Sequence, residues 1–384
     1  MTGRPRIAHV INSLGLGGVP QLVYQLLAAL PRDGQELWLY LLRGAPDQPE
    51  GRLPQAERFR NLGIKLRFPR RDEKKFYVVG ELCRWLQEDR IDILHTHSYK
   101  PNLYGRLAGS LCRNRGLRII AHYHNDYDNK WQEDDSLVYE QLLAHSCDRF
   151  LACSEAVGHH VAERIGIAPG AVRVVLNGID LERFRHTGDR AALRAELGIA
   201  PERRVVGMVG RLCRQKAQDV LLQAAPRIRA QFPDVLFLLA GAADEAATLA
   251  ELQGMAADLG LAEQVRFLGY VRDIPRIYGA LDVLAMPSRW EGFGLALAEA
   301  MAMGVPIVTT PVGGIPEVVG DCALRVNPDE ANELAAAIAA LLADPARADA
   351  LGRAAAERAE RFCHRRVGGE VQTIYRELMA EAAP

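Results

Sequence analysis

Two glutamates, Glu291 and Glu299, lie eight positions apart around a glycine-rich segment that follows an apolar run. The apolar residues 283–288 have the composition of a buried strand, and the pattern after them predicts a helix. Gly292 and Gly294 let backbone N–H groups approach a ligand closely, and unpaired N–H groups at a helix start attract phosphate or hydroxyl oxygens. The two carboxylates suit hydroxyl pairs on one long ligand, such as a sugar and a ribose. An ordinary strand, turn and helix with an acid near its start explains the same residues equally well.

A second group of charged residues follows the first expected strand of the C-terminal half. Arg211 and Lys216 lie in the segment 210–216, directly after that strand. Two fixed cations at the carboxyl end of a strand suit a diphosphate whose negative charge grows as it leaves. A solvated basic loop is the alternative interpretation.

The first strand of the chain ends in a glycine-rich turn that opens a helix. Gly15 and Gly17 match half of a dinucleotide-binding fingerprint, but its third position is Pro20, and Arg43 rather than an acid follows the second strand. The match is therefore partial. The same loop would let a diphosphate lie against its backbone.

Histidines cluster at two expected strand ends, with His95 and His97 on one strand and His122 and His124 on the next. Alternate residues of a strand share a face, so each pair is expected to project to one side. A hydrogen bond to a sugar hydroxyl is favoured over a metal site, because nothing in the sequence brings the two pairs to ligand distance. A structural role is the simpler explanation for at least two of the four.

Two further segments have chemical interest but little specificity. Asp126-Tyr127-Asp128 has the DxD form that metal-dependent sugar transferases use, although two exposed loop acids explain it better. Residues 67–77 combine five cations with three aromatic side chains, which suits an anionic acceptor or lipid headgroups at the inner face of a membrane. A solvated loop with a few anchoring aromatics is the favoured interpretation of that stretch.

The elements that must position these residues alternate between strand and helix. Short apolar runs, several of them continuous, are separated by longer stretches with helical periodicity, which predicts parallel sheets covered by helices on both faces. At 384 residues the chain is too long for one core. We expect an α/β fold with two doubly wound domains, residues 1–187 and 188–365, and a C-terminal helix at about 366–384 that joins the first domain. Ligands of such sheets bind at the carboxyl ends of the strands.

Composition narrows the classes of partner. A net charge of −1 gives no bulk attraction to nucleic acid, and seven scattered cysteines without a CxxC pair predict neither a disulfide framework nor a zinc site. No secretory leader is recognisable, and no apolar run approaches the roughly 20 residues that span a bilayer. These features predict a cytoplasmic protein, with any membrane contact being peripheral.

Taken together, the motifs resemble the family 4 glycosyltransferases. The most specific part runs from Ser288 through the glycines to Glu299, continues in Gly304-Val305-Pro306 and ends in the segment 313–317. The resemblance covers nearly the whole chain. It implies a retaining enzyme of the GT-B fold, in which two Rossmann-like domains face each other across a deep cleft, the N-terminal domain holding the acceptor and the C-terminal domain the nucleotide-sugar donor.

The resemblance also assigns roles to individual residues. Glu291 is expected beside the donor sugar, Glu299 at the ribose hydroxyls, and Arg211 and Lys216 at the diphosphate. His124 is expected to touch the sugar from the first domain, with His122 as the alternative, and these assignments make Glu291, His124, Arg211 and Lys216 the catalytic set. The donor-binding set is Gly17, Gly18, Arg211, Lys216, Tyr270, Val271, Glu291, Gly292, Phe293, Gly294, Leu295 and Glu299.

The sequence departs from the family pattern in two places. Pro20-Gln21 occupies positions where an acidic and then a basic residue are common, and Ala217 stands where glycine is common. Both leave the named contacts intact. The stretches 120–125 and 151–154 look similar to the branch that builds capsules and exopolysaccharides.

The expected reaction moves a sugar from a nucleotide diphosphate to a hydroxyl of a glycan, a lipid-linked or a small-molecule acceptor. A uridine diphosphate donor is favoured over a guanosine one, and neither a metal nor another cofactor is expected, since cations and helix starts replace the divalent ion. The closest rival is an epimerase or hydrolase of the same fold. The incomplete glycine fingerprint argues against a nicotinamide-dependent dehydrogenase. A nucleotide-sugar-binding protein without catalysis would bind a uridine diphosphate without turnover.

Overall fold

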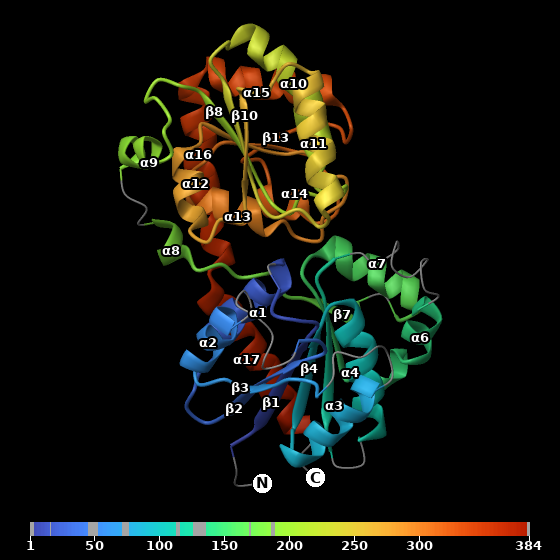
Figure 1. The fold of residues 1–384 in the computed structure, drawn as a ribbon. Helices are drawn as coiled ribbons and strands as arrows, with labels where there is room; N and C mark the ends of the chain where they lie inside the picture. The colour runs from blue at the N-terminus through green and yellow to red at the C-terminus, as the bar shows by residue number, and fades with distance from the viewer. Residues whose placement is uncertain are drawn as a thin grey trace. The chain divides into compact units, whose positions relative to one another are not determined.

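The structure, a computed structural model, describes residues 4–15, 17–44, 53–70, 77–112, 116–125, 136–168, 170–185 and 189–381. The chain divides into two compact units. Unit 1 comprises Met1–Gly178 together with His364–Pro384, and unit 2 comprises Ile179–Cys363. In each unit, helices cover both faces of a central parallel sheet (Figure 1). The predicted pair of doubly wound sheets is confirmed.

Unit 1 contains a seven-stranded sheet in the order β3-β2-β1-β4-β5-β6-β7, with every neighbouring pair parallel. Its strands are β1 (Arg6–Ile11), β2 (Glu36–Leu41), β3 (Lys65–Arg67), β4 (Ile93–His97), β5 (Arg118–Tyr123), β6 (Arg149–Ala152) and β7 (Val172–Val174). Its helices are α1 (Gly18–Ala29), α2 (Leu53–Asn61), α3 (Tyr77–Glu88), α4 (Tyr99–Leu111), α6 (Ser136–Leu142), α7 (Glu155–Ile165) and α17 (His364–Glu381), with a short 3-10 turn at Ala144–Ser146. The chain reverses its direction of growth across the sheet between β3 and β4, so β1 and β4 meet at the switch point.

The two faces of β1 explain why all but one of its residues after Arg6 are apolar. Ile7 and Ile11 pack into the cluster that α1, α2 and α17 cover, whereas Ala8 and Val10 pack into the cluster under α3 and α4. A strand buried on both sides needs apolar residues at every position rather than at alternate ones. His9 is the exception, and it projects to the side of Ile7 and Ile11.

The last helix of the chain, α17, packs on α1 of unit 1. Gly368 lies so close to α1 that a Cβ atom there would stand 2.6 Å from the Cβ of Ala29. Two small residues therefore let the helix backbones approach each other. Val367, Val371 and Tyr375 on the same helix are buried in the unit 1 core.

Unit 2 contains a six-stranded sheet in the order β10-β9-β8-β11-β12-β13, again parallel throughout. Its strands are β8 (Val205–Val209), β9 (Leu236–Ala240), β10 (Val265–Gly269), β11 (Val283–Met286), β12 (Ile307–Thr309) and β13 (Leu324–Arg325). Its helices are α8 (Leu181–Arg185), α9 (Arg190–Glu196), α10 (Gln218–Gln231), α11 (Ala246–Asp258), α12 (Ile274–Ala280), α13 (Leu295–Ala302), α14 (Ile315–Val319), α15 (Ala331–Ala343) and α16 (Pro345–Ala359), followed by a 3-10 turn at Glu360–Phe362. Here β8 and β11 meet at the switch point.

The structure begins unit 2 at Ile179, nine residues before the boundary expected near residue 188. Helix α8 belongs to unit 2 because the ring of Phe184 packs edge-on against Tyr278, with 6.2 Å between centroids. Arg183 adds a hydrogen bond of 3.1 Å to the carbonyl of Arg272. Local sequence does not reveal this, because the partners of α8 lie about ninety residues further along the chain.

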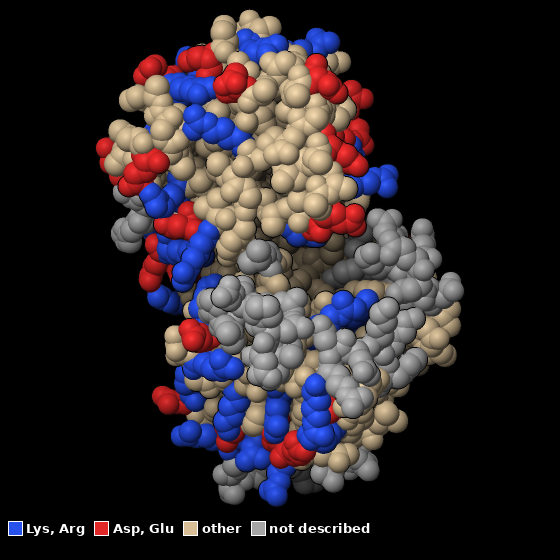
Figure 2. Space-filling view, viewed as in Figure 1, with Lys and Arg blue, Asp and Glu red and all other residues tan. Residues whose placement is uncertain are grey.

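No helix in the described parts of the chain is both long and apolar enough to cross a membrane. On the described part of the unit 1 face shown in Figure 2, basic side chains predominate, with a few acidic ones among them. In the basic segment predicted at 67–77, Arg67 is bound by Asp89 and Glu88, and residues 71–76 lie outside the described residues.

Candidate functional site

The glycine-rich loop after β11 lies in unit 2, where the chain turns into α13. Gly294 caps this helix in the left-handed region, at φ 84°, and no side chain caps its first turn. The N–H groups of that turn therefore have no partner among the local side chains and suit an anion or a hydroxyl oxygen. The predicted helix start and loop are thus placed as the pattern indicates, with Phe293 buried beneath them and Leu295 at the first helical position.

Lys216 and Glu291 form an ion pair in unit 2, between the loops that follow β8 and β11. The two side chains are only 13% and 11% exposed. Burial at this level weakens solvent screening, so the pair is stronger than one on an open surface. The structure therefore joins two residues that the sequence had assigned to different parts of a ligand.

The backbone around Glu291 is held by a close contact with the loop after β12. The N–H of Gly314 donates to the carbonyl of Glu291 at 3.0 Å. Gly313, at φ 52°, lies so close that a Cβ atom there would stand 2.0 Å from the same carbonyl oxygen. Only glycine fits this position, which explains the Gly313-Gly314 part of the motif.

The loop after β8, which carries Lys216, is also tied to the β11 loop by Gln215. Its amide donates to the carbonyl of Trp290 at 3.0 Å, and its own carbonyl accepts from the N–H of Arg289 at 2.9 Å. Ala217 follows with φ 60°, a left-handed conformation that costs about 1–2 kcal/mol for a residue with a Cβ atom. That conformation explains why glycine is common at this position in the family that the sequence resembles.

Arg211 lies at the carboxyl end of β8 and faces Asp244 in the loop after β9. Its Nη1 donates to both carboxylate oxygens of Asp244, at 2.8 and 2.6 Å, and the two side chains are 46% and 41% exposed. Exposure makes the pair weak, so the guanidinium remains available to a stronger anion. Asp244 was missed in the sequence, although its place after a strand of the sheet is a signal that could have found it.

Glu299 projects from α13 toward α12, where the hydroxyl of Tyr278 donates to it at 2.9 Å. Burial raises the pKa of Glu299 to about 7, against the opposing effects of the Tyr278 hydrogen bond and of the charge on Arg183. A carboxyl group of this kind takes up or releases a proton near neutral pH. Tyr278, like Asp244, was not singled out in the sequence.

Tyr270 and Val271, expected near the base, follow β10 at the same edge of the unit 2 sheet. Tyr270 is about half exposed, and Gly269 before it has φ 62°. The carbonyl of Gly269 accepts from the N–H of Gly241 at 2.8 Å, which joins this loop to the one after β9. All the unit 2 residues of the predicted donor set except Glu299, which lies within α13, are therefore on loops or helix starts at the carboxyl ends of its strands.

In unit 1, the glycine-rich turn leads directly into α1, whose N-cap is Gly17 and whose first residue is Gly18. No side chain caps this helix either. Pro20 lies in its first turn, where the absence of an N–H group costs no helical hydrogen bond. The departure from the family pattern at this position is therefore compatible with the helix.

The four predicted histidines do come together in unit 1, and a fifth, His9, joins them. His95 and His97 on β4 pair in register with His9 on β1 and His122 on β5. Donor nitrogens of two trios, His9, His95 and His97, and His97, His122 and His124, lie within 4.8 Å of one another. The sequence could not reveal this proximity, which depends on the order of the strands.

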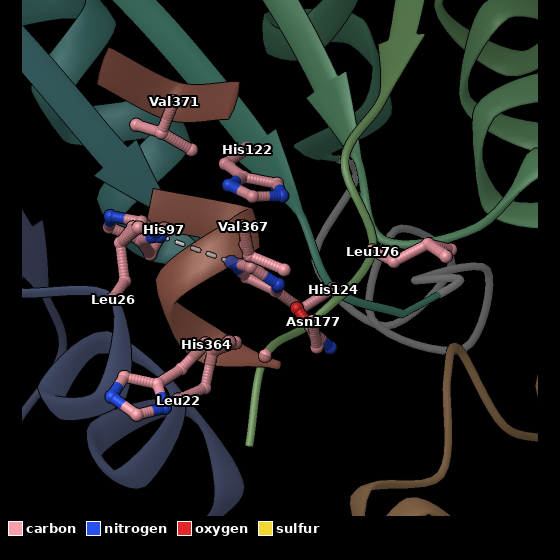
Figure 3. Close-up of a pocket in the computed structure, with 11 residues that line it drawn as sticks. Leu22, Leu26, His97, His122, His124, Leu176, Asn177, His364, Val367 and Val371 are labelled. Carbon is pink, nitrogen blue, oxygen red and sulfur yellow. Dashed lines mark hydrogen bonds between the residues drawn. The ribbon is translucent and has the colours of Figure 1, made fainter. Parts of the chain in front are cut away.

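All five imidazoles are buried and uncharged at neutral pH. Burial lowers the pKa of His9 to about 3 and that of His124 to about 3, and it also lowers the pKa values of His95, His97 and His122. His97, His122 and His124 line a cavity of about 10 Å³ together with Asn177 (Figure 3). The structure thus puts both His122 and His124 at the same cavity. Asp126-Tyr127-Asp128 lies outside the described residues.

Comparison with known proteins decides the family. Residues 16–183 match the family described as Glycosyltransferase Family 4, and residues 189–358 match Glycosyl transferases group 1. A D-inositol 3-phosphate glycosyltransferase of Saccharomonospora viridis is 37% identical over 318 residues, which cover 79% of this chain and 69% of that protein. The chain belongs to the family 4 glycosyltransferases. A second enzyme of that name, from Mycobacterium sp. strain KMS, is 32% identical over 79% of this chain and 72% of its own length.

Solved structures agree with the GT-B fold of this glycosyltransferase. Anabaena HepE, solved with UDP and glucose, superposes with a TM-score of 0.85 at 23% identity, over 97% of this chain and all of that one. Sucrose-phosphate synthase from Thermosynechococcus elongatus gives 0.82 at 24% identity, over 98% of this chain. The resemblance to the capsule and exopolysaccharide branch is not supported, because the similar curated proteins named above act on an inositol phosphate.

Proposed function

We propose that the protein transfers a sugar from a uridine diphosphate sugar to a hydroxyl of a small polyol acceptor, with retention at the anomeric carbon and without a metal ion. The observation that carries this proposal is the Lys216–Glu291 pair beside the uncapped start of α13. It combines a cation for phosphate, a carboxylate for sugar hydroxyls and a helix start without a side-chain cap within one loop cluster. The donor is supported by the fold neighbour that was solved with UDP-glucose.

In the proposed reaction, the bond between the anomeric carbon and the β-phosphate oxygen breaks, and the acceptor oxygen forms the new bond on the same face of the sugar. Lys216, Arg211 and the α13 start stabilise the departing diphosphate, where the negative charge develops. The leaving phosphate takes the proton of the acceptor hydroxyl. Glu291 holds the sugar, and Glu299 accepts hydrogen bonds from the ribose hydroxyls.

Unit 1 contributes His124 beside the sugar and the Gly17-Gly18 backbone at the diphosphate in this proposal. His124 is suited to a neutral hydrogen bond rather than to proton transfer, because burial holds its pKa at about 3. The acceptor to test first is D-inositol 3-phosphate, on which the 37% identical relative acts by name.

The test is a transfer assay with the full chain. Uridine, guanosine and adenosine diphosphate sugars are each incubated with and without D-inositol 3-phosphate, in the presence and absence of EDTA, and the products are identified by mass. The proposal expects a new glycoside only with a uridine diphosphate sugar, unaffected by EDTA. Free sugar or an epimerised nucleotide sugar without any glycoside would favour the hydrolase or epimerase instead.

A further inference from the structure

Five of the ten histidines of the chain lie in one buried cluster with Tyr375 of α17. The five are His9, His95, His97, His122 and His124. Such a run of polar rings in the core of a parallel sheet is expensive unless every ring nitrogen finds a partner. Their hydrogen bonds therefore decide what the cluster can do.

The six side chains form one unbranched chain of hydrogen bonds. Its links are His122 Nδ1 to His95 Nε2 (3.3 Å), His95 Nδ1 to Tyr375 Oη (2.7 Å), Tyr375 Oη to His9 Nε2 (3.0 Å), His9 Nδ1 to His97 Nε2 (2.9 Å) and His97 Nδ1 to His124 Nε2 (3.1 Å). Each inner imidazole uses both of its nitrogens, one toward each neighbour. Tyr375 bonds the two halves of the chain together at its middle.

The number of protons restricts this chain to two arrangements. A neutral imidazole carries one ring proton and a phenol carries one, so six groups supply six protons for five links and one proton remains. Every link needs one proton, and the partners that the described residues offer to the Tyr375 hydroxyl proton are His95 and His9. Because Tyr375 must therefore donate to one of these rings and accept from the other, all donors point the same way along the chain. In one arrangement all five histidines carry the proton on Nδ1, and in the other all five carry it on Nε2.

The remaining proton lies at one of the two ends. In the first arrangement it is on Nδ1 of His124, and in the second it is on Nε2 of His122. Each end lies beside a group that favours a proton on the terminal ring. Burial lowers the pKa values of both rings, but the Asn177 side chain raises the pKa of His124 and the backbone of Val175 raises the pKa of His122. One proton cannot serve both.

We propose that Tyr375 couples the tautomers of His122 and His124, so that only one of these two terminal imidazoles donates from its outer nitrogen at a time. Tyr375 is then a positioning residue: it determines whether the outer nitrogen of His124 offers a proton or a lone pair. Both terminal rings line the cavity of about 10 Å³, which has room for one hydroxyl group or water (Figure 3). A hydroxyl that accepts from His124 selects the first arrangement, and one that donates to His124 selects the second.

A metal ion at His97, His122 and His124 fits the proton count less well. If one nitrogen of each ring bound the ion, the other nitrogens would all have to donate away from it. Both halves of the chain would then donate to Tyr375 Oη, and its hydroxyl proton would have no acceptor within the cluster. The arrangement without an ion satisfies every link.

The test reads the tautomers directly, by two-bond ¹H–¹⁵N correlation spectra of the ¹⁵N-histidine-labelled full chain, in which protonated and bare ring nitrogens are well separated. In the wild type, the five cluster histidines are expected to share one tautomer or one common ratio of the two. In Tyr375→Phe the chain breaks into two pieces, and each end can keep a proton. His9, His97 and His124 should then carry Nδ1–H, whereas His95 and His122 should carry Nε2–H.

The matched control is Tyr40→Phe, which removes another buried hydroxyl of unit 1, one bonded to Asp89 at 2.7 Å, and should leave the five tautomers unchanged. Mixed tautomers among the five in the wild type would overturn the coupling, even if Tyr375→Phe failed to fold. Unchanged tautomers in Tyr375→Phe would overturn it as well.

The importance of this coupling for catalysis rests on the proposed function, in which His124 meets the donor sugar. Turnover of Tyr375→Phe is therefore measured separately. If Tyr375→Phe shows different tautomers in the two halves of the chain but transfers sugar normally, His124 does not belong to the donor site, whereas the coupling itself is still supported.

Discussion

Lys216 and Glu291 are 75 positions apart in the chain, yet they form an ion pair because β8 and β11 are neighbours in the unit 2 sheet. The two loops that carry them leave the sheet at the same edge. The strand order of unit 2 thus brings together two charged residues on which the proposed reaction depends.

Breaking this pair should cost stability as well as activity. Lys216→Met or Glu291→Gln alone leaves a mostly buried charge without its partner and should lower the free energy of unfolding by roughly 1–3 kcal/mol. The double variant should recover most of that loss, because no charge remains unpaired. Urea unfolding of the four proteins measures the coupling, and additive losses would contradict it. All three variants should lose transfer activity.

Arg211→Ala should reduce kcat/KM for the donor without lowering stability. Loss of a charge-assisted hydrogen bond to the diphosphate corresponds to about 1.5–3 kcal/mol, or roughly a 10- to 150-fold decrease. The Asp244 pair is too exposed to add much to folding. Arg325→Ala is the matched control, since Arg325 is also an exposed, ion-paired arginine of unit 2. Equal kcat/KM values for Arg211→Ala and the wild type would show that Arg211 does not bind the donor.

Glu299 should make stability depend on pH between about 4.5 and 7. Its folded pKa is raised to about 7, so the folded state binds more protons than the unfolded state in this interval and loses stability as the pH rises. Over the whole interval, the loss attributable to this group is about 3 kcal/mol. Glu299→Gln, which stays neutral, should lack this component. Chemical unfolding of both proteins at pH 5, 6, 7 and 8 measures this difference. If the free energies of unfolding of the two proteins change in parallel with pH, the pKa of Glu299 is not raised.

The buried histidines should cause the opposite trend at lower pH. Their folded pKa values lie well below 6.5, so the unfolded state takes up protons that the folded state does not, and stability falls as the pH drops from 6.5 toward 3. Each contributes up to about 1.4 kcal/mol per pH unit in that window. Proton uptake on unfolding at pH 5.5, measured by calorimetry in buffers of different ionisation enthalpy, should exceed two protons. Uptake near zero would show that the cluster is already charged.

Gly313→Ala should disrupt the Glu291 loop. The new Cβ atom would stand 2.0 Å from the carbonyl oxygen of Glu291 and would require φ 52°, so both the loop and its ion pair must shift. We expect a destabilisation of about 1–3 kcal/mol and loss of donor binding. Gly254→Ala is the control: it lies exposed within α11 with open space around it, and alanine there should stabilise by about 0.5–1 kcal/mol. Donor binding retained in Gly313→Ala would contradict the constraint.

The sequence predicts the local elements well, because local patterns determine them. Continuous apolar runs such as those at β8 and β9 identify strands buried on both faces, and the glycines after β11 mark the start of α13. Both are properties of neighbouring residues. The two doubly wound sheets and the donor loops of unit 2 were therefore recognisable from the residues alone.

Contacts that depend on strand order and on distant helices are not visible in the sequence. His9 lies in an apolar strand, and only the pairing of β1 with β4 brings it beside His95 and His97. Tyr375 lies in the last helix and reaches the cluster because α17 returns to unit 1. The start of unit 2 at Ile179 was not visible for the same reason, since α8 finds its partners far along the chain.

The stereochemistry of transfer, followed by ¹H NMR from the first turnovers, tests the proposed reaction most directly. The enzyme is mixed with an α-linked uridine diphosphate sugar and D-inositol 3-phosphate, and the anomeric proton of the product glycoside, which cannot mutarotate, is observed. The proposed mechanism predicts an α-linked glycoside together with one equivalent of UDP, and no such signal from Lys216→Met. A β-linked glycoside, or release of the sugar without a glycoside, would contradict it.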